Sequence, residues 1–169
     1  MREPLTRTLG LADEDATDRL GQQLASALGD RPAGWLMLLE GELGAGKSTL
    51  ARAMLRAWGL TGAVPSPTYT LVEPYEFAGF TAYHIDLYRV VDEEELEFLG
   101  FSDMGDGLRL IEWPDRAQSL ETGADLLVRL SYAGEGRLAT LTALTPRAIE
   151  ALSGCLLYTS DAADEYNPV

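Results

Sequence analysis

One glycine-rich segment constrains this chain of 169 residues more than any other part of its sequence. It runs from Gly41 to Ser48 and has the pattern G-x-x-x-x-G-K-[ST]. The continuous apolar run before it, residues 35–40, is typical of a strand that is buried on both faces of a parallel sheet. The amphipathic run after it, residues 47–58, predicts a helix that ends near Gly59. The order is therefore strand, glycine-rich loop and helix.

This order gives the segment a chemical role. Glycines let the backbone curl so that successive N–H groups point at phosphate oxygens, and the start of the following helix favours the same anion. In this pattern the lysine reaches the β- and γ-phosphates, and the hydroxyl group ligates Mg²⁺. A turn without a ligand is the alternative, but it gives no reason for the flanking strand and helix. The predicted nucleotide site comprises Gly41, Glu42, Leu43, Gly44, Ala45, Gly46, Lys47, Ser48 and Thr49.

The use of lysine supports the same segment and bears on the nucleobase. Lys47 is the only lysine among the 13 Lys and Arg residues, so arginine has been used wherever either cation serves. A compact ammonium group on a flexible stem is thus kept only in the loop.

GTPases that are specific for guanine usually carry N-K-x-D, which would need another lysine, and D-x-x-G after the loop. The D-x-x-G tract of this chain, residues 18–21, precedes the loop, so adenine is favoured by elimination.

A phosphate site of this kind needs an acidic group near the metal at the end of a neighbouring strand. Glu112 ends the apolar run 108–111, and Asp86 lies near the end of the run 81–87. For either carboxylate, a solvated position at a strand end is the alternative. His84, the only histidine, is more often a packed or hydrogen-bonded residue than a catalyst in such a setting. Trp113 fits either the core or an exposed stacking surface.

Composition and the remaining pattern limit the class of protein. The net charge is −14, which makes the chain a poor nucleic-acid binder by itself, so a basic partner would have to hold any nucleic acid. A single cysteine excludes an internal disulfide framework. Because the sequence shows neither an apolar run of about 20 residues nor a targeting signal, we expect no membrane span and a cytoplasmic location.

Further helices are expected at 12–28 and 92–99, and hairpins at 70–87 and 126–144.

Five blocks of the sequence, in this order, resemble the TsaE family of small bacterial ATPases. They are GELGAGKST at 41–49, SPTYTLV at 66–72, HIDLYR at 84–89, ELEFLG at 95–100 and IEWP at 111–114. The resemblance extends over roughly residues 5 to 145. It implies an α/β fold of the P-loop NTPase type, with three layers and a mixed parallel/antiparallel sheet.

The resemblance also implies cofactors and roles. ATP and Mg²⁺ would be bound, with Lys47 at the phosphates and with Ser48 and Glu112 as metal ligands. Asp86 would be needed for hydrolysis, and the loop at 66–70 would sense the γ-phosphate. The adenine would lie near an N-terminal strand and the turn at 132–137.

The partners that the resemblance implies are TsaD and TsaB, which transfer a threonylcarbamoyl group to an adenosine next to the tRNA anticodon. ATP hydrolysis, slow or dependent on these partners, would reset their assembly, and tRNA would be contacted only through the complex. The acidic charge of this chain agrees with that division. A P-loop small-molecule kinase is one alternative function, and an interaction module that binds nucleotide with negligible turnover is another.

The end of the sequence, CLLYTSDAADEYNPV at 155–169, looks like the in-frame translation of a sequencing adapter. We therefore expect residues 1–154 to form a single P-loop ATPase domain and residues 155–169 to be a non-native tail. An ordinary polar C-terminus is the alternative.

Deleting residues 155–169 should leave ATP binding and the melting temperature unchanged. The segment has few large apolar side chains, so burial cannot offset the roughly 1–2 kcal/mol of backbone entropy that each ordered residue costs. Calorimetric melting and ATP titration of the full and shortened chains test this. A shortened chain that melts several degrees lower would show that the tail is a native, packed element.

Overall fold

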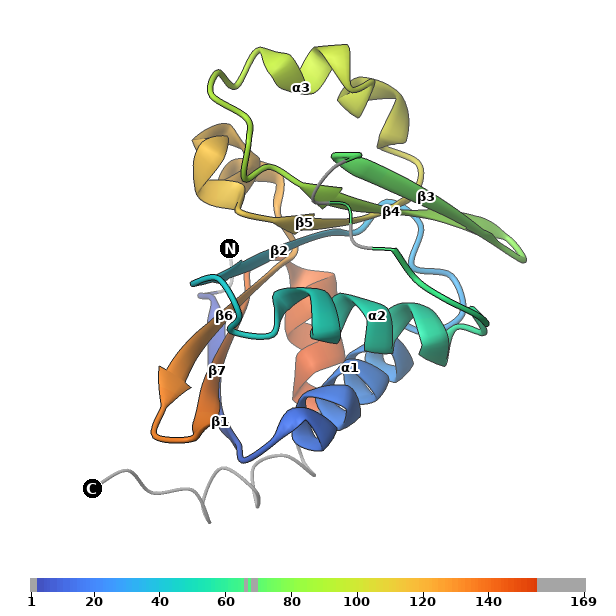
Figure 1. Cartoon of the computed structure of the whole chain (residues 1–169). Coiled ribbons are helices and arrows are strands. Elements are labelled where there is room, and N and C mark those ends of the chain that lie inside the picture. The colour runs from blue at the N-terminus through green and yellow to red at the C-terminus, as the bar shows by residue number, and fades with distance from the viewer. Residues whose placement is uncertain (1–2, 66, 68–69, 155–169) are drawn as a thin grey trace.

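A computed structural model describes residues 3–65, 67 and 70–154 of the chain (Figure 1). Its strands are β1 (Leu5–Leu11), β2 (Leu36–Gly41), β3 (Val72–Phe77), β4 (Phe80–Asp86), β5 (Leu108–Glu112), β6 (Leu126–Ala133) and β7 (Gly136–Ala143). Its α-helices are α1 (Glu14–Leu28), α2 (Lys47–Ala57) and α3 (Glu95–Phe98), and residues 146–154 are also helical. Short 3₁₀ turns are η1 (Phe101–Met104), η2 (Pro114–Arg116) and η3 (Gln118–Gly123).

The strands form one mixed sheet in the order β1-β7-β6-β2-β5-β4-β3. The four central strands, β6, β2, β5 and β4, are parallel to one another. The edges are antiparallel: β7 and then β1 follow β6 on one side, and β3 pairs with β4 on the other. The predicted mixed sheet and both predicted hairpins are thereby confirmed.

The sheet is the middle of three layers, as Figure 1 shows, with α1 and α2 side by side on one face and α3 over the other. Strand β2 explains why its sequence is apolar without alternation. Met37 and Leu39 belong to the larger core cluster under α1 and α2, whereas Leu36 and Leu38 belong to the smaller cluster on the α3 side. Both faces of β2 are therefore buried, as expected for a central parallel strand.

Individual residues explain how helix α1 begins and how closely it approaches helix α2. Asp13 caps α1 by accepting a hydrogen bond from the Ala16 N–H at 2.9 Å. Gly21 lies where α1 crosses α2, and a Cβ atom there would lie 2.5 Å from the Cβ of Ala53. Any larger residue at position 21 would push the helices apart.

One expectation from local pattern needs correction. The helix expected at 92–99 is a single turn, Glu95–Phe98, between bends and 3₁₀ structure. Strand β5 ends at Glu112, because Trp113 turns into the left-handed region with φ 59°. Strand β1, which local pattern does not single out, pairs with β7 along its whole length. Within the described part of the chain, no helix combines the length and apolar character needed to cross a membrane.

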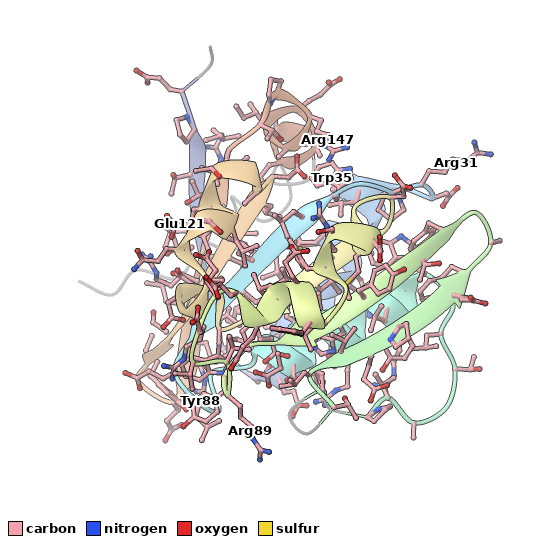
Figure 2. All side chains as sticks on the ribbon, turned by 90° about the horizontal axis from the view of Figure 1, so that it is seen from above. Arg31, Trp35, Tyr88, Arg89, Glu121 and Arg147 are labelled. Carbon is pink, nitrogen blue, oxygen red and sulfur yellow. The ribbon has the colours of Figure 1, made fainter. Side chains whose placement is uncertain are left out.

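A buried carboxylate links the strands at the amino-terminal ends of β2 and β6, opposite the glycine-rich loop. Asp125, just before β6, accepts hydrogen bonds from the Leu36 N–H at 2.9 Å, from the Thr145 hydroxyl at 2.8 Å, and from Nε and Nη2 of Arg147, both at 2.9 Å. Figure 2 shows Arg147 beside Trp35, whose ring centre is 4.8 Å from the guanidinium carbon. Burial pushes the pKa of Asp125 upward, but these hydrogen bonds outweigh it and leave the pKa below its ordinary value.

Replacing Arg147→Gln should lower the free energy of unfolding by about 2 kcal/mol at neutral pH, because Asp125 loses its charged hydrogen-bond donor. A lowered folded-state pKa stabilises the fold fully above the unfolded value of about 3.9, and this contribution is lost as the pH falls through the folded value. The deficit should therefore shrink in acid.

Urea unfolding at neutral and acidic pH measures both effects. Arg31→Gln is the matched control, because Figure 2 shows Arg31 pointing away from the body of the protein. A deficit that is equal at both pH values would contradict the role assigned to the ionised Asp125.

Candidate nucleotide-binding site

The glycine-rich loop connects the end of β2 to the start of α2, as predicted. Gly44 and Gly46 adopt φ values of 82° and 111°, which L-residues with a Cβ rarely adopt. A Cβ on Gly44 would also lie 2.8 Å from the Tyr132 hydroxyl oxygen. That hydroxyl donates a hydrogen bond to the Leu43 carbonyl at 2.7 Å. The hairpin of β6 and β7 thus supports the loop from outside and leaves room only for glycine.

Lys47, the first residue of α2, is buried and turned back over the loop. Its ammonium group donates to the carbonyl oxygen of Gly41, and to that of Glu42 at 3.2 Å. The ring of Trp113 lies on its other side, with the centroid 4.0 Å away. Burial lowers the pKa of Lys47, and the nearby carboxylates of Glu112, Asp86 and Asp115 act in the opposite direction. The side chain is therefore a desolvated cation that is held within reach of the cavity.

Both acidic candidates lie beside Lys47. In the parallel pairing of β4 with β5, Asp86 is directly opposite Glu112, and both are buried. The Ser48 hydroxyl donates to Oε2 of Glu112 at 2.8 Å. Asp86 accepts a hydrogen bond from the Tyr88 N–H at 2.9 Å through Oδ1. The alternative of solvated strand-end carboxylates is excluded for both residues.

These groups line one cavity of about 170 Å³ at the carboxyl ends of β2, β4 and β5. Its lining residues are Leu43, Gly44, Gly46, Lys47, Ser48, Thr49, Asp86, Glu112 and Trp113. Three predicted loop residues lie outside this lining. Gly41 and Glu42 hold Lys47 through their carbonyl groups, and Ala45 faces the neighbouring cavity. The structure brings the predicted residues together around one cavity, and their role as a nucleotide site stays a prediction.

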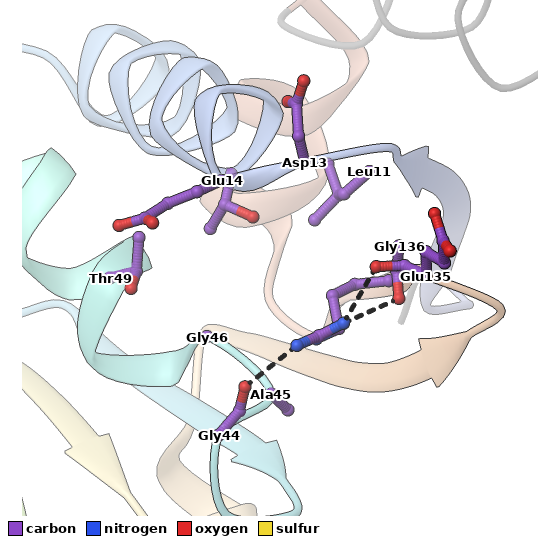
Figure 3. A pocket seen from close by; sticks show the side chains of 11 residues that line it. Leu11, Asp13, Glu14, Gly44, Ala45, Gly46, Thr49, Glu135 and Gly136 are labelled. Carbon is purple, nitrogen blue, oxygen red and sulfur yellow. Dashed lines mark hydrogen bonds between the residues drawn. The ribbon is translucent and has the colours of Figure 1, made fainter.

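The neighbouring cavity, of about 200 Å³, lies between the loop, the start of α1 and the turn from β6 to β7 (Figure 3). Its lining residues are Leu11, Asp13, Glu14, Thr17, Gly44, Ala45, Gly46, Thr49, Glu135, Gly136 and Arg137. Arg137 reaches from β7 to the carbonyl of Gly44 at 3.3 Å, one of the dashed lines in Figure 3. Because the two cavities share Gly44, Gly46 and Thr49, they are adjacent along the loop.

Trp113 proves to be part of the cavity wall. It is half-buried, contacts Lys47, and places its ring centroid 4.9 Å from that of Tyr88. Neither of the two interpretations open at the sequence level, core or exposed stacking surface, describes this position fully. Its left-handed backbone turns the side chain toward Lys47 at the end of the glycine-rich loop.

His84 is packed and hydrogen-bonded, as the sequence favoured, but sequence reasoning did not identify Glu112 as its partner. This side chain is 1% exposed, and its Nε2 lies 2.6 Å from the same Glu112 oxygen that accepts from Ser48. The available signal was spacing, because residues 84 and 86 on one strand point to the same face of a sheet. Sequence reasoning also did not find the contacts of Tyr132 and Arg137 with the loop, since these residues lie 89 and 93 positions from their partners.

The loop at 66–70, predicted as the segment that senses the γ-phosphate, is only partly covered. Ser66, Thr68 and Tyr69 lie outside the described residues. Beside them, the Asp86 N–H donates to the Leu71 carbonyl at 2.9 Å, so this segment adjoins the acidic pair. Its role in sensing nucleotide is still a prediction.

Comparison of the sequence and the fold with known proteins identifies relatives of the chain. The sequence model of one family, described as threonylcarbamoyl adenosine biosynthesis protein TsaE, matches residues 11–139. A relative from Haemophilus influenzae, named tRNA threonylcarbamoyladenosine biosynthesis protein TsaE, is 49% identical over 112 residues, which cover 65% of this chain and 71% of the relative. A relative of the same name from Aquifex aeolicus is 33% identical over 135 residues, 79% of this chain and 92% of the relative.

A solved structure, that of YdiB from Bacillus subtilis, superposes with a TM-score of 0.71. The superposition covers 94% of this chain and 99% of YdiB at 23% sequence identity. At this level of identity the likeness concerns the fold alone. It confirms the α/β architecture that was expected from the sequence.

Adding Mg-ADP should change the tryptophan fluorescence of the protein, and Trp113→Phe should abolish the change. The physical reason is that Trp113 lines the cavity and contacts Lys47, whose ammonium would move toward a bound phosphate. Trp58→Phe is the control, because Trp58 packs against Phe77 and Phe80 instead. A full response in Trp113→Phe would show that the nucleotide binds away from this wall.

Proposed function

The chain belongs to the TsaE family, and on this premise we propose that it is an ATP hydrolase required for threonylcarbamoyladenosine modification of tRNA. The observation that carries the proposal is the convergence of Lys47, Ser48, Asp86 and Glu112 on one cavity beside the glycine-rich loop. This arrangement supports ATP hydrolysis, and the resemblance to the TsaE family implies that this hydrolysis is slow or dependent on partner proteins.

The shape of the site supports a nucleoside triphosphate. The loop backbone and Lys47 suit the phosphates in the first cavity, since Gly44, Gly46 and Lys47 line it where α2 begins. The adjacent second cavity would take the base, between the start of α1 and the β6–β7 turn. Asp13, Glu14 and Glu135 line it, and the choice of adenine over guanine rests on the sequence, which lacks the N-K-x-D pattern.

The donor set suits Mg²⁺. Ser48 and Glu112 bring a hydroxyl and a carboxylate oxygen within 2.8 Å of each other, and Mg²⁺ prefers such hard oxygen ligands. Among the described residues, no group of three or more His, Cys, Asp or Glu side chains could hold a metal without other ligands. In the proposal, the phosphates of the nucleotide complete the coordination, as is usual for Mg²⁺ in such sites.

Each residue then has a task in hydrolysis. Lys47 would exchange its hydrogen bonds to the Gly41 and Glu42 carbonyls for phosphate oxygens. Ser48 and Glu112 would hold Mg²⁺, which supplies charge neutralisation at the phosphates. Asp86, fixed by the Tyr88 N–H, presents a buried carboxylate at the cavity wall and would assist the attack of water.

TsaD and TsaB are the proposed partners, as the family resemblance implies, and the cytoplasm is the proposed compartment. The relatives are named for threonylcarbamoyladenosine biosynthesis, which supports a role in this pathway. A chain with net charge −14 repels the phosphates of tRNA, so contact with tRNA would pass through the partners.

ATP hydrolysis should be slow for the chain alone and should rise when purified TsaD and TsaB are added. Lys47→Ala should weaken ATP binding about 100-fold, because the loss of one partner of a buried charge pair costs about 3 kcal/mol. Lys47→Arg should also fail, since a planar guanidinium group does not fit the place of the ammonium group.

Glu112→Gln should fold normally and hydrolyse ATP more slowly, with Glu121→Gln, a change on the exposed turn η3, as the matched control. Calorimetry and phosphate release with and without the partners provide the measurements. Wild-type affinity in Lys47→Ala would refute the phosphate site. ADP formation that depends on a small-molecule acceptor would favour the kinase alternative, and the absence of turnover with the partners would favour the interaction module.

A further inference from the structure

We propose that His84 positions the carboxylate of Glu112 for the metal site, by donating a hydrogen bond from Nε2 to Oε2. The inference rests on the proposed function, because the orientation of Glu112 matters for catalysis only if Ser48 and Glu112 hold Mg²⁺. It concerns a residue that the cavity lining does not include and that sequence reasoning favoured as a packed or hydrogen-bonded group.

The contact is short and almost fully enclosed. Nε2 of His84 lies 2.6 Å from Oε2 of Glu112, and the two residues are 1% and 3% exposed. A buried carboxylate without hydrogen-bond donors is costly, so its donors decide which way it points. Among the described residues, the side chains that donate to this carboxylate are those of His84 and Ser48.

The two donors are not equivalent in the proposed reaction. If the Ser48 hydroxyl oxygen ligates Mg²⁺, the Ser48 contribution to the orientation of Glu112 changes when the metal binds. The imidazole of His84 is not in the cavity and has no such second task. It is therefore the donor that can hold Oε2 in the same place before and after the metal arrives.

The other ring nitrogen indicates which tautomer is present. Nδ1 of His84 is buried and has no hydrogen-bond partner among the described residues. A proton on Nδ1 would therefore be a buried donor without an acceptor, which proteins avoid. The hydrogen-bond pattern assigns the proton to Nε2, where the carboxylate of Glu112 accepts it.

The backbone makes this arrangement rigid. His84 and Asp86 project from the same face of β4, and Asp86 is paired with Glu112 on the parallel strand β5. Two neighbouring carboxylates repel each other, so each needs its own donor to keep a fixed orientation. Asp86 takes the N–H of Tyr88, and Glu112 takes His84. A site supported from two paired strands is more precise than one that is supported by loops.

His84 does not have the geometry of a general base. Its Nε2 is engaged by Glu112, its Nδ1 is enclosed, and the ring does not line the cavity where water and phosphate would meet. It acts through Glu112 and is a positioning residue.

The first test uses the fact that His84 is the only histidine. Selective ¹⁵N-histidine labelling of the untagged chain, without nucleotide or metal, gives one pair of ring nitrogen signals that needs no assignment between residues. We expect the proton on Nε2, and we expect Glu112→Gln to shift this signal while Glu121→Gln leaves it unchanged. A ring whose Nε2 carries no proton, or a signal that Glu112→Gln does not move, would overturn the proposal.

The second test measures what the contact does for the metal. ADP affinity is determined by calorimetry in Mg²⁺ and in EDTA for the wild type, His84→Gln, His84→Asn and His84→Leu. The amide nitrogen of Gln reaches the place of Nε2, whereas that of Asn reaches only the place of Nδ1. We expect His84→Leu and His84→Asn to lose about tenfold of the gain in ADP affinity that Mg²⁺ gives, as for other outer-shell partners. His84→Gln should restore most of this gain. The ADP affinity in EDTA should be unchanged in all three variants.

Two outcomes of this test count against His84: a full Mg²⁺-dependent gain in His84→Leu, or an equal loss of affinity in EDTA and in Mg²⁺. Melting curves identify variants that do not fold, and in that case the labelled wild-type chain decides. If wild-type protein shows no gain from Mg²⁺ at all, the proposed function fails. The ¹⁵N experiment, which needs neither metal nor nucleotide, still tests the contact itself.

Discussion

Parallel pairing of β2 with β5, and of β5 with β4, brings the carboxyl ends of three strands to one edge of the sheet. Each of these strands delivers one part of the site at that edge. The loop that leaves β2 leads into Lys47 and Ser48 at the start of α2, β5 ends in Glu112, and β4 ends in Asp86. A shift of β4 by one residue against β5 would turn Asp86 and His84 to the opposite face and separate them from Glu112.

The site is built around one cation and several anions. Burial lowers the pKa of Lys47, and the nearby carboxylates of Glu112, Asp86 and Asp115 oppose this shift without reversing it. Its ammonium is satisfied by two backbone carbonyls and the face of Trp113. In the proposed function, a triphosphate adds further negative charge to this region, so Mg²⁺ and the release of Lys47 from the carbonyls both become necessary for tight binding.

The hairpin of β6 and β7 contacts the glycine-rich loop through two side chains. Tyr132 and Arg137 bond to the carbonyls of Leu43 and Gly44 and stack on each other, with 4.2 Å from the guanidinium carbon to the ring centroid. These contacts hold the outer side of the loop, while Lys47 bonds to the carbonyls of Gly41 and Glu42. The second cavity lies beside the same hairpin, so any ligand that occupies both cavities contacts the loop, α1 and β7 together.

The sequence by itself determined the features that depend on near neighbours. The strand, glycine-rich loop and helix around Lys47, the unbroken apolar character of β2, the two hairpins and the two acidic candidates all follow from periodicity, turn residues and a short motif. The five blocks that resemble the TsaE family added the mixed sheet. Only the tertiary structure decided which distant residues meet. Glu112 bonds to Ser48 across 64 positions and to His84 across 28, and Leu43 meets Tyr132 across 89. Strand order, register and side-chain burial set such contacts, and no local pattern encodes them.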